Sequence, residues 1–261
     1  MSAMKIALFA TNVVGLEVAR FLGAAGEPPA CLILDSQDAV GLNAQIVEGS
    51  GVKDAAAIFY SNSLAGPQTL AALRELGLDL AILAWWPYII KPELISVPRL
   101  GCLNFHPSYL PYNRGKHYNF WALVEGAPFG VTLHWVGDAV DCGDIAFQSR
   151  IETTWADTGA TLYHKAQQEI VRLFKESYPA IKSGNIPRVP QELECGSFHF
   201  ARELEEASRI ELDKTYTARD LLNLLRARTF PPHPAASFVA DGQTYEVRVE
   251  IRKIGDEGQD D

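Results

Sequence analysis

The sequence predicts an α/β protein with a mainly parallel, twisted sheet, followed by a small C-terminal α+β appendage that contains a β-hairpin. The first observation is that apolar runs alternate with helical patterns through the first half of the chain, which is typical of strand-helix-strand units. The second is a helical segment near the C-terminus, followed by two strand-like runs that turn at Asp241-Gly242.

Five predicted strands follow one another in the first half, with helical segments between most of them. The strands are expected at 5–10, 30–35, 56–61, 78–85 and 101–105, and the helices at 15–24, 41–49 and 66–76. Since parallel strands need a crossover connection, this spacing favours right-handed strand-helix-strand units in an open sheet.

The pattern changes after residue 126. Two further strands are expected at 129–137 and 144–152, joined by an acidic turn, so they predict a mixed edge of the sheet. A long helix follows, with Asp157 or Thr158 as its N-cap, and runs towards Gly184.

These patterns predict four regions along the chain. They are a main domain over 1–184, a proline-spotted connector over 185–209, a small subdomain over 210–254 and a disordered, solvated tail over 255–261. The subdomain of about 50 residues is small for an independent core.

Composition narrows the class of protein. The 261 residues include 23 Lys plus Arg and 32 Asp plus Glu, and the formal net charge of −9 disfavours nucleic acid as a partner. The four cysteines are scattered without a C-x-x-C pair, and this spacing argues against both a zinc site and a disulfide framework. No apolar run approaches the ~20 residues of a membrane helix. We therefore expect a reduced, cytoplasmic enzyme or binding protein without a membrane partner.

Asn104 and His106 are the first candidates for chemistry. Residues i and i+2 of a strand project from one face, so both side chains should lie together at the end of the strand over 101–105, where Pro107 keeps His106 out of helical geometry. Ligands of open sheets bind beyond the carboxyl ends of the strands. Asp141, in a turn between later strands, can approach and orient His106. The alternative is a turn-stabilising Asn and an ordinary hydrogen-bonded His.

A metal loop is the other interpretation of the acidic turn. Asp138, Asp141 and Asp144 lack the ligand pattern of an EF-hand, because Val140 and Cys142 intervene without side-chain oxygens. The sequence therefore predicts no metal site there, and Asp138 and Asp144 also suit a solvated turn.

Several spaced motifs resemble one family. "GCLNFHPSYLPYNRG", "WALVEG", "GVTLHWV" and "VDCGDIAFQ" are similar, in this order, to motifs of the formyltransferase family, and the resemblance covers roughly residues 4–180. It implies a Rossmann-like formyltransferase fold and transfer of a formyl group from N10-formyltetrahydrofolate to an amine, without a metal. It also implies that Asn104, His106 and Asp141 occupy the family's three catalytic positions.

The resemblance further implies a folate site in two segments. The residues that it assigns to the cofactor are Trp86, Pro87, Tyr88, Ile89, Ile90, Asp138, Ala139 and Val140. Backbone groups there would read the pterin edge, and apolar side chains would flank its ring. A competing interpretation is that Trp85 and Trp86 form a core cluster.

The segment "YNRGKHYNFWALVEG" is similar to that of sugar N-formyltransferases. This implies as acceptor a nucleotide-linked amino sugar, such as a dTDP-4-amino-4,6-dideoxyhexose, for O-antigen or other surface polysaccharides. Cationic contacts suit a diphosphate, although a solvated basic turn would look the same. The residues assigned to the acceptor are Arg114, Lys116, His117, Tyr118 and Asn119.

Other functions stay open at the level of sequence. "FATNVVGLEVA" replaces the Gly-Ser-Asn phosphate loop that glycinamide ribonucleotide enzymes of this family usually carry. A methionyl-tRNA formyltransferase-like enzyme, a formyltetrahydrofolate hydrolase and a non-catalytic nucleotide-binding module are the alternatives. The C-terminal hairpin is in addition a candidate for contact in a homodimer.

Overall fold

The computed structural model describes residues 4–255 and divides the chain into two compact units that interleave in sequence. The first unit comprises the residues up to His106 together with Val131–Ser149 and Gln167–Gln191, and the second comprises Pro107–Gly130, Arg150–Ala166 and the residues from Glu192 onward. The domain boundaries expected from the sequence stay a prediction. Apart from Gly255, the expected disordered tail lies outside the described residues.

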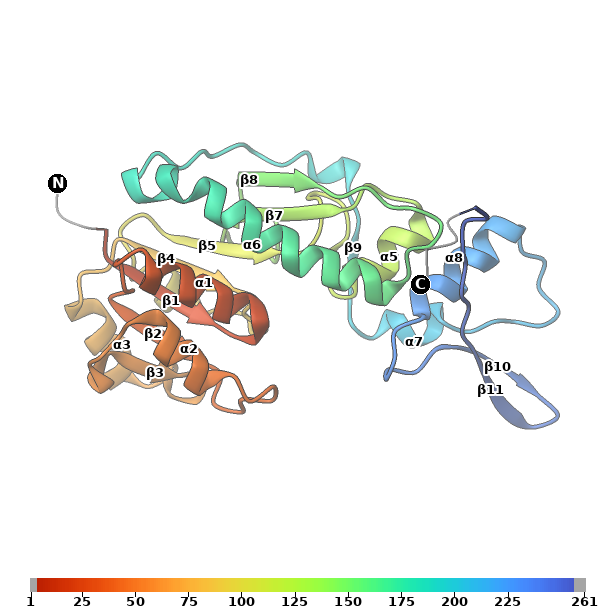
Figure 1. Ribbon diagram of the computed structural model, residues 1–261, viewed down its shortest axis with the longest axis horizontal. Helices are drawn as coiled ribbons and strands as arrows, with labels where there is room; N and C mark the ends of the chain where they lie inside the picture. The colour runs from red at the N-terminus through yellow and green to blue at the C-terminus, as the bar shows by residue number, and fades with distance from the viewer. Residues whose placement is uncertain (1–3, 256–261) are drawn as a thin grey trace. The chain divides into compact units, whose positions relative to one another are not determined.

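A seven-stranded sheet forms the centre of the first unit, in the order β3-β2-β1-β4-β5-β7-β8 (Figure 1). Its strands are β1 (Ile6–Ala10), β2 (Cys31–Leu34), β3 (Ile58–Tyr60), β4 (Leu80–Ala84), β5 (Cys102–His106), β7 (Gly130–Trp135) and β8 (Ile145–Arg150). The pairs from β3 to β5 are parallel, and β7 runs antiparallel to β5. The expected mainly parallel sheet with a mixed edge is thus confirmed.

The central strands are apolar along their whole length because both faces of the sheet are covered. On one face, alternate residues such as Phe9, Ile33 and Leu83 pack in a buried cluster with Leu73 of α3 (Pro67–Glu75) and Leu94 of α4 (Pro92–Ile95). Short 3-10 helices, Ala55–Ala57 and Ser61–Ser63, flank β3.

Aromatic side chains join further helices of this unit. α1 (Asn12–Ala24) lies against α2 (Asn43–Ser50) and α6 (Gly159–Ser183), and Phe21 of α1 meets Phe174 of α6 edge to face, with ring centroids 5.8 Å apart. Phe174 is fully buried and also packs on Phe105 of β5. Burial of such a side chain contributes about 1.5–3 kcal/mol. Although α6 is long, no helix among the described residues is apolar enough over a sufficient length to cross a membrane.

All four cysteines are free thiols. Burial raises the pKa of the Cys31 thiol to about 12, and it does the same for Cys102. These two thiols stay protonated at neutral pH and act as small apolar core residues.

The second unit combines short helices with two small sheets. The helices are α5 (Tyr118–Glu125), α7 (Glu203–Ala207), α8 (Ala218–Arg228) and the 3-10 helix Leu193–Cys195, and the strands are β6 (Arg114–Gly115), β9 (Phe198–His199), β10 (Ala236–Ala240) and β11 (Gln243–Val247). The helix and the hairpin expected near the C-terminus are confirmed. The segment expected to be a plain connector contains β9 and α7, because β9 pairs in parallel with β6.

Asp157 organises the start of α6 within the second unit. Its buried carboxylate accepts hydrogen bonds from the Thr154 amide (2.7 Å), the Thr161 hydroxyl (3.0 Å) and the Lys165 ammonium (2.9 Å). The Thr158 hydroxyl accepts from the Thr161 amide. Burial alone would raise the pKa of Asp157, but the Lys165, Thr154 and Thr161 hydrogen bonds outweigh it and lower this pKa.

We expect Asp157→Ala to lower the free energy of unfolding by about 3 kcal/mol at pH 7, since the donors of Thr154, Thr161 and Lys165 lose a buried acceptor. Because the folded pKa is depressed, the stabilisation is present above the unfolded pKa of about 3.9 and is lost as pH falls through the folded value. Urea unfolding at pH 7 and pH 3 measures both effects. Exposed Asp213→Ala is the control and should change little. An equal loss at both pH values would contradict this assignment.

Candidate active site

Asn104 and His106 lie on β5 of the first unit, at the carboxyl end of the strand. Strand alternation places both on one face, as expected from the sequence. Asn104 is half-buried, and His106 is 5% exposed. The antiparallel register with β7 sets Asn104 opposite His134, which adds a second imidazole to this face.

Asp141 reaches this pair from the loop between β7 and β8. Its Oδ2 lies 3.4 Å from Nδ1 of His106, and its Oδ1 lies 3.4 Å from Nε2 of His134 and 3.5 Å from Nδ2 of Asn104. The side chain of Asp141 is only 10% exposed, so its interactions with the two rings are weakly screened. The structure therefore brings the three predicted catalytic residues together inside one unit.

His134 determines how the Asn104 amide points. Nδ1 of His134 lies 2.9 Å from the carbonyl oxygen of Trp135, so the network assigns a proton to Nδ1. Nε2 then accepts from Nδ2 of Asn104 at 3.1 Å. The second N–H of this amide makes only the long contact with Asp141, and it is the donor that a ligand oxygen can take over.

The backbone of the Asp141 loop is held at two points. Nε2 of Gln191 donates to the carbonyl oxygens of Asp141 (3.0 Å) and Gly143 (2.6 Å), and the Trp135 amide donates to the carbonyl of Asp144 (2.8 Å). Asp141 itself has φ of 54°, in the left-handed region that Asp tolerates better than most residues. A fixed backbone keeps the carboxylate in front of the two rings.

Sequence reasoning missed two members of this site. His134 lies in the quoted motif "GVTLHWV", and its position on a strand next to the Asn104 strand was the available signal. Gln191 lies in the segment expected to be a connector, 50 residues from Asp141 in sequence, and no local pattern marks it.

The predicted folate residues all lie in the first unit, in two loops. Trp86 and Ile90 are buried in the core, and Trp86 packs edge to face on Phe9 with centroids 5.3 Å apart. Tyr88 and Ile89 are 41% and 82% exposed. Asp138, Ala139, Val140 and Pro87 are exposed loop residues. The outward-facing apolar side chains of both loops suit a flat aromatic ligand better than the buried indole of Trp86 does.

The predicted acceptor residues belong to the second unit. Arg114 donates to the carbonyl oxygens of Ser197 and Leu193, while Lys116 is exposed. Asn119 is buried and donates to the Gly159 carbonyl at 2.8 Å, a contact that also suits a structural role. The five residues belong to the second unit and the three catalytic residues to the first, so the role of the five towards an acceptor stays a prediction.

Two of these residues have shifted acidity. Burial lowers the pKa of His117, helped by the charges of Arg228 and Lys116, so this ring is neutral at pH 7. Burial also raises the pKa of Tyr118. Neither residue offers a charge to a ligand at neutral pH.

Among residues 4–255, no group of three His, Cys, Asp or Glu side chains is placed to hold a metal ion. What the site offers is an imidazole beside a carboxylate, with an amide donor at the edge of an open sheet. An amide and an imidazolium can stabilise charge on a carbonyl oxygen, and a carboxylate can orient the ring or take up a proton. Acyl-transfer chemistry can use groups of these kinds.

Comparison with known proteins identifies the family. The model described as "Formyl transferase" matches residues 21–177, and the model described as "N-formyltransferase dimerization C-terminal domain" matches residues 203–253. The chain belongs to the formyl transferase family, and the resemblance seen in its motifs is confirmed.

Relatives and solved structures agree with this placement. A methionyl-tRNA formyltransferase from Symbiobacterium thermophilum is 30% identical over 180 residues, which are 69% of this chain and 54% of the relative, so the chain spans about half its length. A 4-N formyltransferase from Francisella tularensis has the same fold, with a TM-score of 0.78 and 23% identity over 96% of this chain and 99% of that one. A formyltransferase from Anoxybacillus kamchatkensis, solved with UDP-4,6-dideoxy-4-formamido-L-AltNAc and tetrahydrofolate, gives a TM-score of 0.56 and 25% identity over 84% and 97%.

Proposed function

We propose that this protein transfers a formyl group from N10-formyltetrahydrofolate to the amine of a nucleotide-linked amino sugar. The observation that carries the proposal is the convergence of Asn104, His106 and Asp141 within the first unit of a formyl transferase family member. Formylated sugars of this kind would enter surface polysaccharides such as O-antigen.

Two loops of the first unit support the folate part of this proposal. N10-formyltetrahydrofolate supplies an activated formyl carbon when bound. Exposed Ile89 and Val140 offer apolar surface to a flat ring on the two loops already assigned to it, and the loop backbone around Val140 offers hydrogen-bonding groups. The donor set therefore fits a pterin without a metal.

Each catalytic side chain has one task in the transfer. The N–H of Asn104 that makes the long contact with Asp141, together with the ring of His106, holds the formyl oxygen and stabilises the charge that develops on it. Asp141 keeps His106 oriented and accepts the proton that the attacking amine loses when its bond to the formyl carbon forms. The folate nitrogen that leaves is protonated in turn, so proton and charge balance.

The sugar acceptor is supported by the family neighbours and by charge. Solved structures with this fold include sugar N-formyltransferases, one of them bound to a UDP-linked formamido sugar. A panel assay would test the proposal, with dTDP-, UDP- and GDP-linked amino sugars and methionyl-tRNA as acceptors and mass spectrometry as readout. Mass gain of one formyl group on a nucleotide sugar is expected, and gain on the charged tRNA alone would contradict it.

Methionyl-tRNA is the second candidate acceptor, because the relative at 30% identity carries that name. The net charge of −9 argues against it, since a tRNA backbone would meet a repulsive field. The same panel separates the two.

We also propose that the protein works as a homodimer held by the C-terminal hairpin, within the region that matches the dimerization model. Phe238 and Tyr245 stack across the hairpin, while Val239 points to the other face and is 63% exposed. The hairpin bridges Arg209 at Ser237, and a two-stranded sheet with so little further pairing is only marginally stable in water, so we expect a second copy to cover the rest.

We expect Val239→Lys to shift the protein from dimer to monomer, because a charge at an apolar interface must be desolvated without a partner. Light scattering after size-exclusion chromatography, over a range of concentrations, measures the mass. Tyr60→Lys, an exposed position of the first unit, is the control and should leave the dimer intact. A variant at position 239 that stays dimeric at low concentration would contradict the proposed interface.

A further inference from the structure

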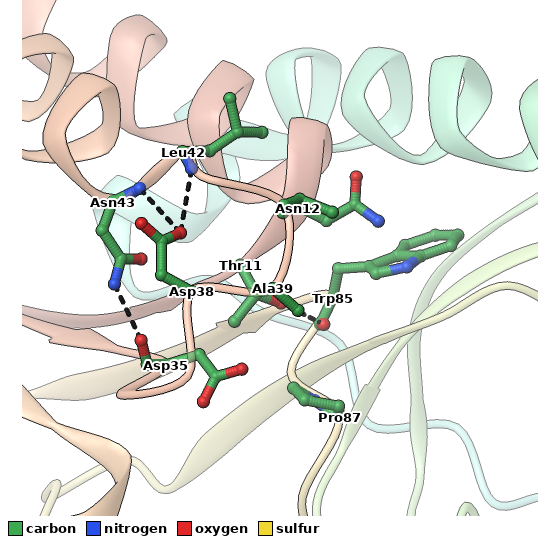
Figure 2. A pocket seen from close by; sticks show the side chains of 10 residues that line it. Thr11, Asn12, Asp35, Asp38, Ala39, Leu42, Asn43, Trp85 and Pro87 are labelled. Atoms are coloured by element: carbon green, nitrogen blue, oxygen red, sulfur yellow. Dashed lines mark hydrogen bonds between the residues drawn. The ribbon is translucent and has the colours of Figure 1, made fainter.

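A pocket in the first unit shares Pro87 with the predicted folate residues, and none of its other lining residues has been assigned a role so far. It has a volume of about 240 Å³ and opens where β1, β2 and β4 end. Ten residues line it, and Figure 2 shows them: Thr11, Asn12, Asp35, Asp38, Ala39, Val40, Leu42, Asn43, Trp85 and Pro87. Carboxyl ends of parallel strands are the usual place for a ligand in an open sheet.

The pocket lining combines acidic and amide side chains with apolar ones. Two carboxylates and two amides face apolar groups of Ala39, Leu42 and Pro87, and this set of lining residues contains no Lys, Arg or His. Such a lining repels phosphate but accepts hydrogen bonds from hydroxyl groups. Its volume lies below the ~300 Å³ at which pockets usually hold a whole drug-sized ligand. A neutral, sugar-sized part of a ligand therefore suits it.

Asp38 is already used by the fold. Its Oδ1 accepts hydrogen bonds from the amides of Leu42 (2.9 Å) and Asn43 (3.2 Å) at the start of α2. This carboxylate holds the wall of the pocket in place.

Only one of the two carboxylate oxygens of Asp35 accepts hydrogen bonds within the described residues. Its Oδ1 accepts from the Tyr88 hydroxyl (3.0 Å), the Ser61 hydroxyl (3.1 Å) and the Gln37 amide (3.2 Å). Its Oδ2 makes no hydrogen bond within the described part of the chain. In Figure 2 the carboxylate points away from Asn43, towards the side of the pocket where Pro87 lies. The three hydrogen bonds to Oδ1 fix the orientation of this carboxylate.

The position of Asp35 in the sheet matches that of a ribose-binding residue in other nucleotide-binding folds. It directly follows β2, and an acidic residue at the end of the second strand of a nucleotide-binding parallel sheet accepts hydrogen bonds from a ribose 2′-hydroxyl.

The opposite wall of the pocket is also rigid, because the Thr11 hydroxyl donates to the Trp85 carbonyl at 2.6 Å and Trp85 has φ of 61°. Such a conformation for a bulky residue persists only where the surroundings enforce it.

We infer that this pocket binds the ribose of a ribonucleotide, with Oδ2 of Asp35 accepting from the 2′-hydroxyl. If the ribose belongs to the acceptor, the inference rests on the proposed function. The pocket then favours a UDP- or GDP-linked amino sugar over a dTDP-linked one, because deoxyribose has no 2′-hydroxyl. The same diol in a free nucleotide such as ADP would occupy the pocket equally.

Calorimetry with UDP and 2′-deoxy-UDP tests the contact without any catalytic step. Wild type should bind UDP about tenfold more tightly, the usual value of one hydrogen bond to a charged acceptor. In Asp35→Asn, which keeps an acceptor oxygen for Tyr88 and Ser61, UDP affinity should fall to that of 2′-deoxy-UDP. Glu48→Gln removes the same charge at an exposed position of α2 outside the pocket lining, so this control should retain the preference. Ala39→Phe fills the pocket and should weaken both nucleotides.

Equal affinities in wild type, a preference that survives in Asp35→Asn, or failure of wild type to bind UDP would each overturn the inference. GDP and ADP as further probes separate an acceptor nucleotide from a general ribonucleotide site. Formylation of a dTDP-linked sugar at the same rate as its UDP-linked counterpart would uphold the proposed function and overturn the assignment of the ribose to the acceptor. A UDP preference lost in Asp35→Asn, without formylation of any sugar, would do the reverse.

Discussion

Asp141→Asn is expected to lower kcat/KM for formyl transfer by about 10²- to 10⁴-fold, the range of a lost general base. The amide has the shape of the carboxylate, but it is uncharged and cannot take the proton of the attacking amine. It also ends the attraction that orients His106 across 3.4 Å. Steady-state kinetics with the acceptor found in the panel assay measure the effect.

Asp144→Asn is the matched control for this experiment. Asp144 lies in the same loop, carries the same charge, and contributes only its backbone carbonyl to the Trp135 amide. Its kcat/KM should stay within about threefold of wild type, as for substitutions away from functional contacts. If Asp141→Asn retained more than a tenth of the wild-type rate, the role assigned to this carboxylate would be wrong.

Gly143→Ala is expected to lower kcat by about 100-fold, the loss that a catalytic group displaced by about 1 Å can cause. A Cβ at Gly143 would stand 1.8 Å from the Trp135 carbonyl oxygen, so the loop must move. Gln191 holds the carbonyls of both Gly143 and Asp141, and any shift of one is passed to the other. The effect should fall on kcat more than on the folate KM.

Gly137→Ala tests whether the close approach at Gly143 is the cause. A Cβ at Gly137 would meet Gly143 at an ordinary 3.5 Å, so this variant should stay near wild type. The double variant Gly143→Ala, Asp141→Asn should be hardly slower than Asp141→Asn alone, since both changes act on one carboxylate. Additive losses would show that Gly143 acts independently of the Asp141 carboxylate.

Much of the fold follows from local patterns. Continuous apolar runs such as Leu80–Ala84 predict strands buried on both faces, and the helical segments between them require parallel pairing. The predicted boundaries of β1, β2, β4 and β5 agree with the structure within two residues. The helix α7 escaped prediction because its five residues are too few to show a period.

Local patterns also predicted one part of the candidate site and missed another. Strand alternation alone placed Asn104 beside His106, and the quoted motifs gave Asp141. Local pattern could not choose between Trp85 and Trp86. In the structure Trp86 packs on Phe9 in the core and Trp85 lines the pocket.

By itself, the sequence determined the class of fold, the pair on β5 and the family, because periodicity and motif spacing are local properties of a chain. The tertiary structure decided which distant groups join that pair. His134 enters through strand register, the Asp141 backbone is held by Gln191, and Asp35, which lines a pocket, is held by Tyr88. Such contacts depend on how separate elements pack, and no periodicity along the chain records them.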